Sequence, residues 1–315
     1  MEINKLPILL WESSNPTSDK HLKRLKKYFN VIKNRNLIKH KEKENVIGIA
    51  THTSPTKFYD YRFFEEFINL KFVASPTTGN THFDMKKLEN NGIKVFLIKN
   101  RKVLQDITSS SEHALFLMLS VFRNSKKVYK LTEDGSWRKK EKEFRANQIS
   151  GKKVGIIGFG RIGRNVANSL KTLRAKIYIN DIKEFDCEFT QISLEEMFRI
   201  SDAILISCTY DKSSHHLIKK KLMSLSKELF LINIARGEII NERDLIEAIN
   251  YGNVRRYYAD VISSEQLGCE KNILWKASQT NNNINLTPHS AGLSYESEDL
   301  AASDIVNQIE SFIKK

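Results

Sequence analysis

Three side chains in the second half of the sequence have the types that proton transfer beside a bound anion requires. Arg236, Glu265 and His289 each follow an apolar run typical of a buried strand. An arginine binds carboxylates through a permanently charged fork, and a histidine exchanges a proton near neutral pH. A glutamate hydrogen-bonded to that histidine would stabilise the protonated imidazole. The three residues together indicate a site that holds an anion and moves a proton next to it.

A glycine-rich turn near the middle of the chain indicates a partner for this chemistry. Gly158, Gly160 and Gly163 follow an expected strand at 152–157 and precede apolar residues at helical spacing. In such a turn the glycines allow a tight bend, close approach of backbone N–H groups to a pyrophosphate, and packing of helix on strand. Asp181 ends the next strand, where a carboxylate would bind a ribose diol and repel a 2′-phosphate. The sequence therefore predicts NAD as the cofactor.

A nicotinamide supplies hydride, so the three side chains could bind and protonate the molecule that the hydride reduces. Reduction of a 2-oxo acid needs Arg236 to hold the carboxylate and polarise the ketone, and His289 to protonate its oxygen. In an open parallel sheet, ligands bind beyond the carboxyl ends of the strands, where these residues are expected. Each residue alone has a simpler explanation as a surface charge or a turn residue. Their order behind a dinucleotide turn favours catalysis.

The elements that must position these residues alternate between apolar and amphipathic segments along the whole chain, which predicts parallel sheets with helices on both faces. Before the glycine turn we expect strands at 7–10, 31–32, 46–50, 71–74 and 93–97, and helices at 18–29, 58–69 and 85–90. After it we expect strands at 176–180, 203–207, 229–234 and 257–261, and helices at 194–200, 241–250 and 304–313.

The segment before the glycine turn predicts a buried helix and a surface connection. Ser109 to Glu112 has the form of a capping box, and 114–119 is apolar on every side, so this helix is expected between domains or in a subunit interface. The charged stretch 126–150 is expected on the surface. A second capping box is expected at Ser193 to Glu196, and the asparagine-rich 279–285 is expected to form a loop.

Composition narrows the possible partners. The 315 residues suffice for two domains, and the net charge of +14 comes from scattered basic runs without the interleaved aromatic residues that stack bases, so no nucleic-acid partner is predicted. The three cysteines are far apart and predict neither a disulfide framework nor a metal site. No apolar run approaches ~20 residues and no leader is evident, so we expect a cytoplasmic protein without a membrane span.

Over nearly the whole chain, from Lys71 to Gly292, the sequence resembles the D-isomer-specific 2-hydroxyacid dehydrogenases. The most specific matches are Val154–Gly163, Asn233–Gly237 and Thr287–Gly292. The resemblance implies an α/β fold of two doubly wound parallel-sheet domains, with a Rossmann cofactor domain inserted into a flavodoxin-like substrate domain. The substrate or lid domain is expected at 1–104 and 291–315, and the NAD-binding domain at 105–290. It also implies a homodimer with the 112–123 helix at the interface.

The resemblance assigns roles to individual residues. Arg236, Glu265 and His289 match the family's catalytic set, Asp260 its acid near the nicotinamide amide, and the turn 77–79 its substrate-clamping loop. The residues expected to bind substrate are Thr78, Gly79 and Arg236. The residues expected to bind the cofactor are Gly158, Gly160, Arg161, Ile162, Gly163, Asp181, Cys208, Thr209, Ile234, Ala235 and Asp260.

Several positions depart from the family pattern. Many members carry proline where this chain has Cys208-Thr209-Tyr210, and the proline usual after Glu265 is Gln266 here. The segment 275–285 is longer than common. An arginine often found after the strand at 46–50 is absent, with Thr51–Thr53 in its place. Glu265 argues against the formate-oxidising branch of the family, which carries glutamine at this position. The next residue is Gln266, so an alignment shifted by one residue stays open. With no regulatory domain after the closing helix, we expect a short-form enzyme acting on glyoxylate, hydroxypyruvate or a similar acid.

Two other functions compete with this interpretation. An NAD(H)-binding sensor of the co-repressor type would retain the same three side chains, but no peptide-recruiting extension is recognisable. A different Rossmann enzyme, such as a methyltransferase, is opposed by the 233–237 and 287–292 segments.

Overall fold

The computed structural model describes residues 6–12, 18–51, 59–80 and 82–314. It divides into two compact units. Unit 1 comprises Met1–Ile107 and Gly292–Lys315, and unit 2 comprises Thr108–Ala291. The chain thus leaves unit 1, builds unit 2 and returns.

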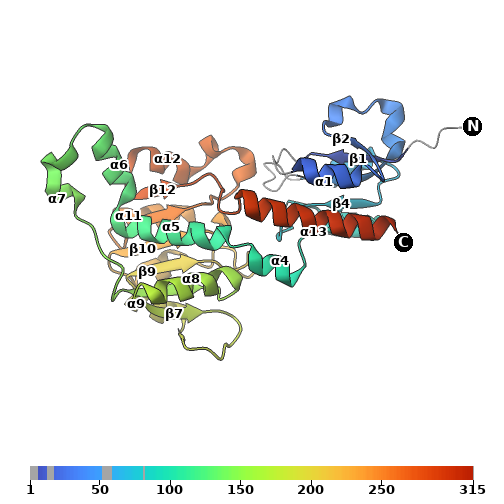
Figure 1. The fold of residues 1–315 in the computed structure, drawn as a ribbon. Helices are drawn as coiled ribbons and strands as arrows, with labels where there is room; N and C mark the ends of the chain where they lie inside the picture. Colours follow the sequence, from blue (N-terminus) through green and yellow to red (C-terminus); the bar gives the residue numbers. More distant parts are fainter. Residues whose placement is uncertain (1–5, 13–17, 52–58, 81, 315) are drawn as a thin grey trace, which may run out of the picture. The chain divides into compact units, whose positions relative to one another are not determined.

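Unit 1 is built on a parallel sheet with strand order β2-β1-β3-β4-β5 (Figure 1). This is the order of a flavodoxin-like doubly wound sheet. The central strands are short apolar runs because helices cover both of their faces. The strands are β1 (Ile8–Trp11), β2 (Asn30–Ile32), β3 (Val46–Ala50), β4 (Phe72–Ala74) and β5 (Lys94–Phe96).

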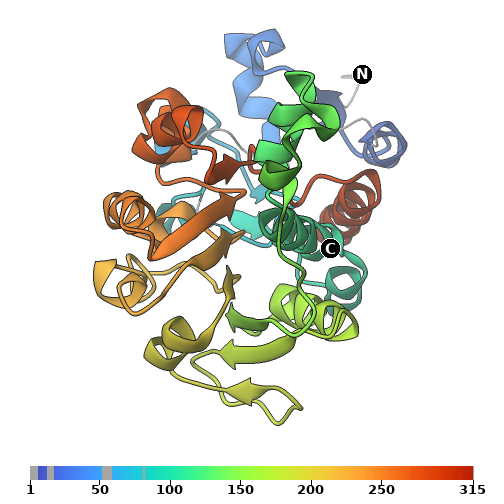
Figure 2. The same ribbon diagram turned by 90° about the vertical axis from the view of Figure 1, so that its left-hand side faces the viewer.

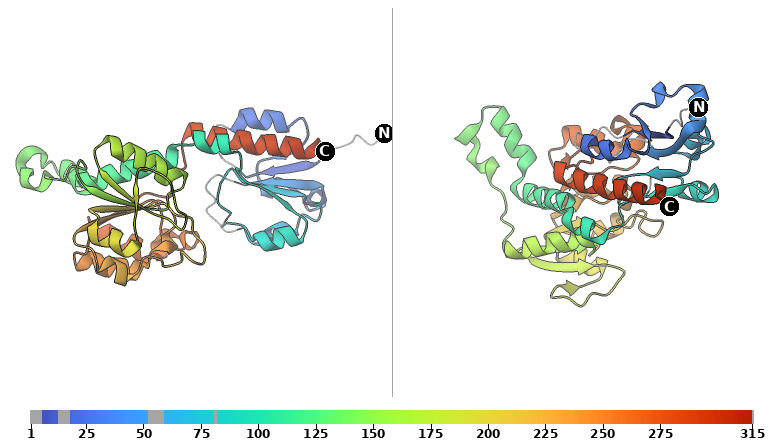
Figure 3. Two further views of the ribbon diagram at one scale, coloured as in Figure 1. Left: turned by 90° about the horizontal axis from the view of Figure 1, so that it is seen from below. Right: turned by 45° about the vertical axis from the view of Figure 1, so that its right-hand side comes forward.

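Helices α1 (Ser18–Leu25) and α13 (Tyr295–Ile313) share one face of this sheet, and α2 (Tyr61–Glu65) and α3 (Met85–Asn90) cover the other. The left panel of Figure 3 shows each sheet between two helical layers. Arg24 on α1 forms an ion pair of 2.8 Å with Glu310 on α13. The C-terminal segment is therefore part of the core that the N-terminal residues form. A short helix, α4 (Arg101–Asp106), follows β5.

Unit 2 is built on a second parallel sheet, with strand order β12-β11-β10-β9-β6-β7-β8. Figure 2 shows its strands fanning with the usual twist. The order reverses between β6 and β9, which is the switch point at which Rossmann sheets bind dinucleotides. The strands are β6 (Lys153–Ile157), β7 (Lys176–Asn180), β8 (Thr190–Gln191), β9 (Ala203–Ile206), β10 (Leu229–Asn233), β11 (Val254–Ala259) and β12 (Ile284–Leu286).

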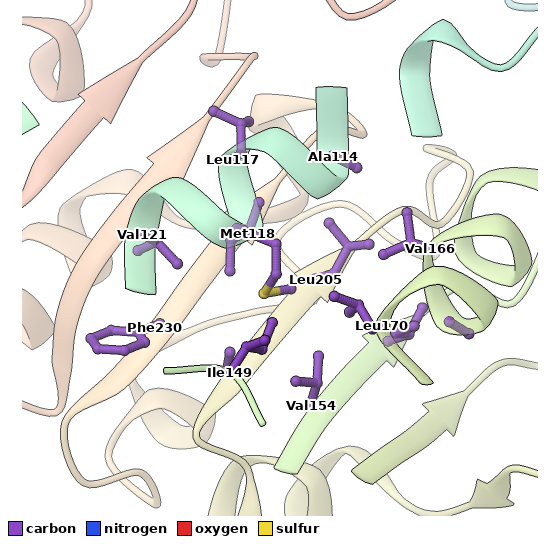
Figure 4. Packing of buried hydrophobic residues seen from close by; sticks show 14 of the residues in the cluster. Ala114, Leu117, Met118, Val121, Ile149, Val154, Val166, Leu170, Leu205 and Phe230 are labelled. Atoms are coloured by element: carbon purple, nitrogen blue, oxygen red, sulfur yellow. The ribbon is translucent and has the colours of Figure 1, made fainter. Parts of the chain in front are cut away.

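Two hydrophobic clusters hold the helices of unit 2 against its sheet. On one face, α5 (Ser109–Arg123) and α8 (Arg161–Thr172) bury side chains such as Met118 and Leu170 against Leu205 (Figure 4). The other face carries α9 (Leu194–Ile200), α10 (Lys220–Met223), α11 (Glu242–Asn250) and α12 (Ile273–Thr280). The predicted fold class, two doubly wound parallel-sheet units, is confirmed.

Several local predictions were wrong. Ser109 is not an N-cap: it is the first residue of α5, whose N-cap is Thr108, and its buried hydroxyl has no hydrogen-bond partner among the described residues. Within one chain, α5 leaves Phe116 50% exposed and Leu119 38% exposed, so its expected burial in a subunit interface stays a prediction. In contrast, the hydroxyl of Ser193 does accept from the N–H of Glu196 at 3.1 Å, as the second capping box predicts.

Helix boundaries also differ from the predictions. The helix expected at 58–69 covers only Tyr61–Glu65 among the described residues, and Phe58 lies outside them. The closing helix begins at Tyr295 rather than at residue 304, because Ser294 caps it by accepting from Ser297 N–H. The sequence did not predict β8, α10 or α12, and the surface connection contains α6 (Ser125–Glu133) and α7 (Glu141–Phe144).

Candidate active site

The predicted site residues of unit 2 all lie at one edge of its sheet, beyond the carboxyl ends of the strands. The glycine turn follows β6, Asp181 follows β7, and Cys208 and Thr209 follow β9. Arg236 follows β10, Asp260 and Glu265 follow β11, and His289 follows β12. Because all seven strands are parallel, this edge collects residues that are far apart in the sequence.

The glycine turn leads directly into the N-terminus of α8. Gly158 has φ of +91°, and a Cβ there would lie 2.4 Å from the Cα of Cys208, so no other residue fits. A Cβ on Gly163 would lie 2.2 Å from the Gly158 carbonyl oxygen, which explains the close packing of helix on strand. A Cβ on Gly160, the N-cap of α8, would meet nothing within 4 Å. The turn is thus packed on its inner side and open at Gly160.

Asp181 is fixed against the glycine turn by two backbone donors. Its Oδ2 accepts from the Phe159 N–H at 2.7 Å, and its Oδ1 accepts from the Lys183 N–H at 3.1 Å. The Lys183 side chain is exposed. A carboxylate therefore stands at the end of β7, beside the turn, as the sequence predicted for the residue that selects the ribose.

The segment after β9 lines the other side of the glycine turn. The hydroxyl of Ser207 donates to the Gly158 carbonyl oxygen at 2.8 Å. Cys208 lies against Gly158, and burial raises the pKa of its thiol to about 11. Thr209 is exposed, and the Tyr210 hydroxyl lies 3.1 Å from Nδ1 of His215.

Arg236 sits on a turn that the side chain of Asn233 shapes. Asn233 is fully buried; its Oδ1 accepts from the Ala235 N–H at 2.9 Å and its Nδ2 donates to the Arg236 carbonyl oxygen at 3.0 Å. The Arg236 guanidinium donates to the Ala235 carbonyl oxygen at 2.7 Å, and no acidic partner of it is found among the described residues. Ile234 and Ala235 are buried at the base of this turn. The structure thus presents one half-buried cation at the end of β10.

Glu265 and His289 are brought together although 24 residues separate them. Nδ1 of His289 lies 2.6 Å from Oε2 of Glu265, and both side chains are about a third exposed, at 39% and 34%. His289 has φ of +52°, an uncommon conformation for a residue with a side chain, and its N–H donates to the Asp260 carbonyl oxygen at 2.9 Å. The backbone at His289 is therefore held in an uncommon conformation, which fixes the position of the imidazole.

Asp260 is only 1% exposed and fixes the segment that carries His289. Its oxygens accept from the Thr287 hydroxyl at 2.5 Å and from the N–H groups of Ser290 and Ala291 at 2.9 and 2.8 Å. Burial would raise the pKa of this carboxyl, but hydrogen bonds from His113, Thr287 and the two N–H groups outweigh it and lower the pKa. Contact of Asp260 with a nicotinamide amide stays a prediction.

Three further residues, which no sequence pattern indicated, support the site. His113 on α5 places its Nε2 2.9 Å from the Thr287 hydroxyl and 3.3 Å from Asp260 Oδ1. Glu238 and Glu242 accept hydrogen bonds from the loop that carries Glu265. His113 follows Glu112 in an apolar helix, where a lone histidine is a weak signal, and the two glutamates look like ordinary helix-start acids.

The predicted substrate residues of unit 1 lie beyond the carboxyl end of β4. The Thr77 hydroxyl donates to the Gly79 carbonyl oxygen at 2.8 Å, which closes a tight turn with Thr78 exposed at its tip. Thr51 is buried at the end of β3, whereas His52 and Thr53 lie outside the described residues.

The residues at the edge of unit 2 fit a dinucleotide. Gly160 leaves room at the N-terminus of α8, where first-turn N–H groups and the helix dipole bind phosphate. Asp181 offers acceptors for a ribose diol. No cluster of metal-ligating side chains occurs in the described part of the chain, and no helix in that part is long and apolar enough to span a bilayer.

A cavity of about 380 Å³ opens elsewhere in unit 2 and contributes nothing to this site. It lies near the amino ends of β6, β9 and β10, at the opposite edge of the sheet. Its wall includes Lys152, Asp202 and Phe230. The candidate residues lie instead at the carboxyl edge of the sheet.

Comparisons with known proteins agree with the fold and the cofactor. A family model for the NAD binding domain of D-isomer specific 2-hydroxyacid dehydrogenases matches residues 115–291. A glyoxylate reductase of Pyrococcus furiosus is 28% identical over 266 residues, covering 80% of this chain and 76% of that protein. A hydroxypyruvate reductase of Blautia hydrogenotrophica is 26% identical over 262 residues, covering 80% and 78%. A formate dehydrogenase of Neurospora crassa is 28% identical over 255 residues, covering 78% and 67%.

A solved structure of D-lactate dehydrogenase from Aquifex aeolicus, complexed with NAD and lactic acid, superimposes with a TM-score of 0.82 at 21% identity, covering 98% of this chain and 95% of that one. The matched family segment contains the glycine turn, Arg236, Glu265 and His289. The chain is an NAD-dependent oxidoreductase that belongs to the D-isomer specific 2-hydroxyacid dehydrogenase family.

Proposed function

We propose that this protein reduces a small 2-oxo acid, such as glyoxylate or hydroxypyruvate, by hydride transfer between NADH and C2 of the acid. The observation that carries the proposal is the 2.6 Å contact between His289 Nδ1 and Glu265 Oε2, at the sheet edge that also holds Arg236 and the glycine turn. The reductases of Pyrococcus and Blautia support this substrate class.

Each residue of the proposed site has its own role in the reaction. A bound nicotinamide supplies the hydride. Arg236 holds the carboxylate of the acid and polarises its carbonyl, because its guanidinium has no acidic partner among the described residues. Glu265 occupies Nδ1 of His289, so Nε2 is the nitrogen that gives its proton to the carbonyl oxygen. In unit 1, the backbone N–H groups of Thr78 and Gly79 are the donors that we propose for a substrate carboxylate.

Glu265 also separates this proposal from formate oxidation. Proton transfer to a ketone oxygen needs an acid, and the Glu265 carboxylate orients the imidazole that would supply the proton. Formate oxidation leaves no oxygen to protonate. The side chain that contacts His289 is the acid at position 265 and not the adjacent Gln266.

The test is NADH oxidation with glyoxylate, hydroxypyruvate and pyruvate, alongside NAD reduction with formate. We expect turnover with at least one 2-oxo acid and none with formate. Arg236→Ala should raise KM for the acid about 10- to 100-fold, the loss of hydrogen bonds to a charged group. Arg243→Ala, which removes an exposed arginine on α11, is the matched control. NADH binding without turnover on any acid would replace this proposal with an NAD(H) sensor.

We also propose that the protein is a homodimer. Phe116 and Leu119 lie three residues apart on α5 and are 50% and 38% exposed, so they present apolar surface on one face of that helix. A second copy packing α5 against α5 would bury them. Sedimentation equilibrium should give a dimer for wild type and a monomer for Phe116→Glu; a monomeric wild type would refute the proposal.

A further inference from the structure

We propose that Glu242 is a positioning residue for Glu265: together with Asn272 it fixes the segment 261–265, from which the Glu265 carboxylate reaches His289. This inference rests on the proposed function, and it concerns residues that do not touch the reacting atoms. Glu242 is the first residue of α11, and Asn272 caps α12.

Three consecutive N–H groups of this segment donate to three different carboxylates. Ile262 donates to Oε1 of Glu265 at 3.1 Å, Ser263 to Oε1 of Glu242 at 2.7 Å, and Ser264 to Oε1 of Glu238 at 2.8 Å. Charge-assisted bonds of this kind are about twice as strong as neutral ones. The loop is thus fixed at the three successive N–H groups that precede Glu265.

Glu242, Asn272 and Ser263 form a closed ring of hydrogen bonds. Asn272 Nδ2 donates to Glu242 Oε2 at 2.8 Å and to the Ser263 carbonyl oxygen at 3.0 Å. Ser263 in turn donates its N–H to Glu242. Both backbone groups of Ser263 are therefore fixed at once, one by α11 and one by the N-terminus of α12.

The chemistry at position 242 requires a side chain that only accepts. Glu242 is 8% exposed, and burial raises its pKa although the donors around it oppose that shift. Both residues that contact its oxygens act as donors: Ser263 through its N–H and its hydroxyl, and Asn272 through its side-chain amide. A glutamine there would satisfy one and turn an NH₂ group toward the other. The near-isosteric Glu242→Gln therefore breaks the ring without leaving a cavity.

The segment also transmits this constraint to Glu265. Ser264, next to Glu265, has φ of +57°, a conformation that persists only when its surroundings impose it. Glu265 bonds back to Ile262 with one oxygen and to His289 with the other. A shift of Ser263 therefore moves its two neighbours, Ile262, which donates to one oxygen of Glu265, and Ser264, which leads directly into Glu265.

The experiment compares Glu242→Gln with Glu247→Gln, alone and in a Glu265→Gln background. Glu247 lies on the same helix and bonds Lys220 at the surface, at 2.8 Å, so its substitution removes a carboxylate without touching the loop. We expect Glu242→Gln to lower kcat for the 2-oxo acid roughly 10-fold, with the Kd for NADH unchanged, and to have no further effect once Glu265 is glutamine. Hydrogen exchange should accelerate in 261–265 for this variant alone.

The possible results distinguish failure of the inference about Glu242 from failure of the proposed function. An active wild type with unchanged kcat in Glu242→Gln would overturn this inference, whether or not hydrogen exchange changes. The same fold-loss in the Glu265→Gln background would also overturn it, because it would mean general damage to the enzyme. A wild type without turnover on any acid would overturn the proposed function instead.

Discussion

Replacing Gly237 by alanine tests whether the turn that carries Arg236 and the loop that carries Glu265 are held in register by direct backbone contact. A Cβ at this position would lie 2.0 Å from the carbonyl carbon of Ile262 and 2.1 Å from the nitrogen of Ser263. Ordinary contact begins at 3.4 Å, so the loop must retreat by about 1.4 Å. Both obstacles are backbone atoms, which no side-chain rotation relieves.

The magnitude follows from what that movement breaks. Glu265 is tied to Ile262 at 3.1 Å and reaches His289 at 2.6 Å, so a shift of about 1.4 Å exceeds the tolerance of that bond. Misplacement of a catalytic group by ~1 Å costs about 10² in rate. Overpacking costs about 1–3 kcal/mol of stability, or roughly 2–12 °C in Tm for a unit of this size.

The assay is steady-state NADH oxidation with the preferred 2-oxo acid, together with thermal unfolding. We expect kcat to fall about 100-fold while the Kd for NADH changes less than about twofold, because the glycine turn lies on other strands. A Gly237→Ala enzyme with wild-type kcat and wild-type Tm would refute the register argument. A loss of NADH affinity equal to the loss of kcat would show instead that the whole edge has collapsed.

Three further perturbations test separate parts of the site. Asp181→Asn keeps an acceptor for the Phe159 N–H but removes the negative charge. The ratio of kcat/KM for NADPH to kcat/KM for NADH should therefore rise about 10-fold or more. An unchanged ratio would show that Asp181 does not select NADH over NADPH. Asp260→Asn places an NH₂ group among donors and should cost about 2–4 kcal/mol in urea unfolding. Folding lowers the pKa of Asp260, so this carboxylate stabilises the folded protein fully above its unfolded pKa of about 3.9. The stabilisation is lost as the pH falls through the folded pKa. The wild-type advantage over Asp260→Asn in free energy of unfolding should therefore shrink only below about pH 4. Iodoacetamide should label the exposed Cys187 and Cys269 at pH 8 well before Cys208, whose raised pKa of about 11 keeps it a thiol; equal labelling by mass spectrometry would contradict this.

The sequence predicted the parts of the fold that depend on local pattern. Apolar runs bounded by turns gave most of the strands, and the glycine spacing gave the strand-to-helix turn at Gly158. Residues at strand ends, such as Arg236 and His289, could be placed at one edge because parallel strands share their direction. The contact between His289 and Glu265 follows from that placement together with the strand order.

What the sequence could not predict depends on long-range contacts. His113 belongs to an apolar helix, and only packing of α5 on the sheet brings its ring to Asp260. Glu242 looks like a helix-start acid, and its bond to Ser263 spans 21 residues. An apolar run on every face predicts that α5 is buried but does not say what covers Phe116, which is 50% exposed in a single chain. These residues act through tertiary neighbours, which no spacing rule encodes.

The central claim is that the edge holding Arg236, Glu265 and His289 directs hydride to C2 of a 2-oxo acid. The most direct measurement supplies hydroxypyruvate and NADH deuterated at C4 of the nicotinamide, and analyses the product by mass spectrometry and chiral chromatography. We predict deuterium at C2 of the D isomer, formed about 10²–10⁴ times more slowly by His289→Gln. A product without deuterium at C2, an L product, or an unchanged rate in His289→Gln would contradict the account.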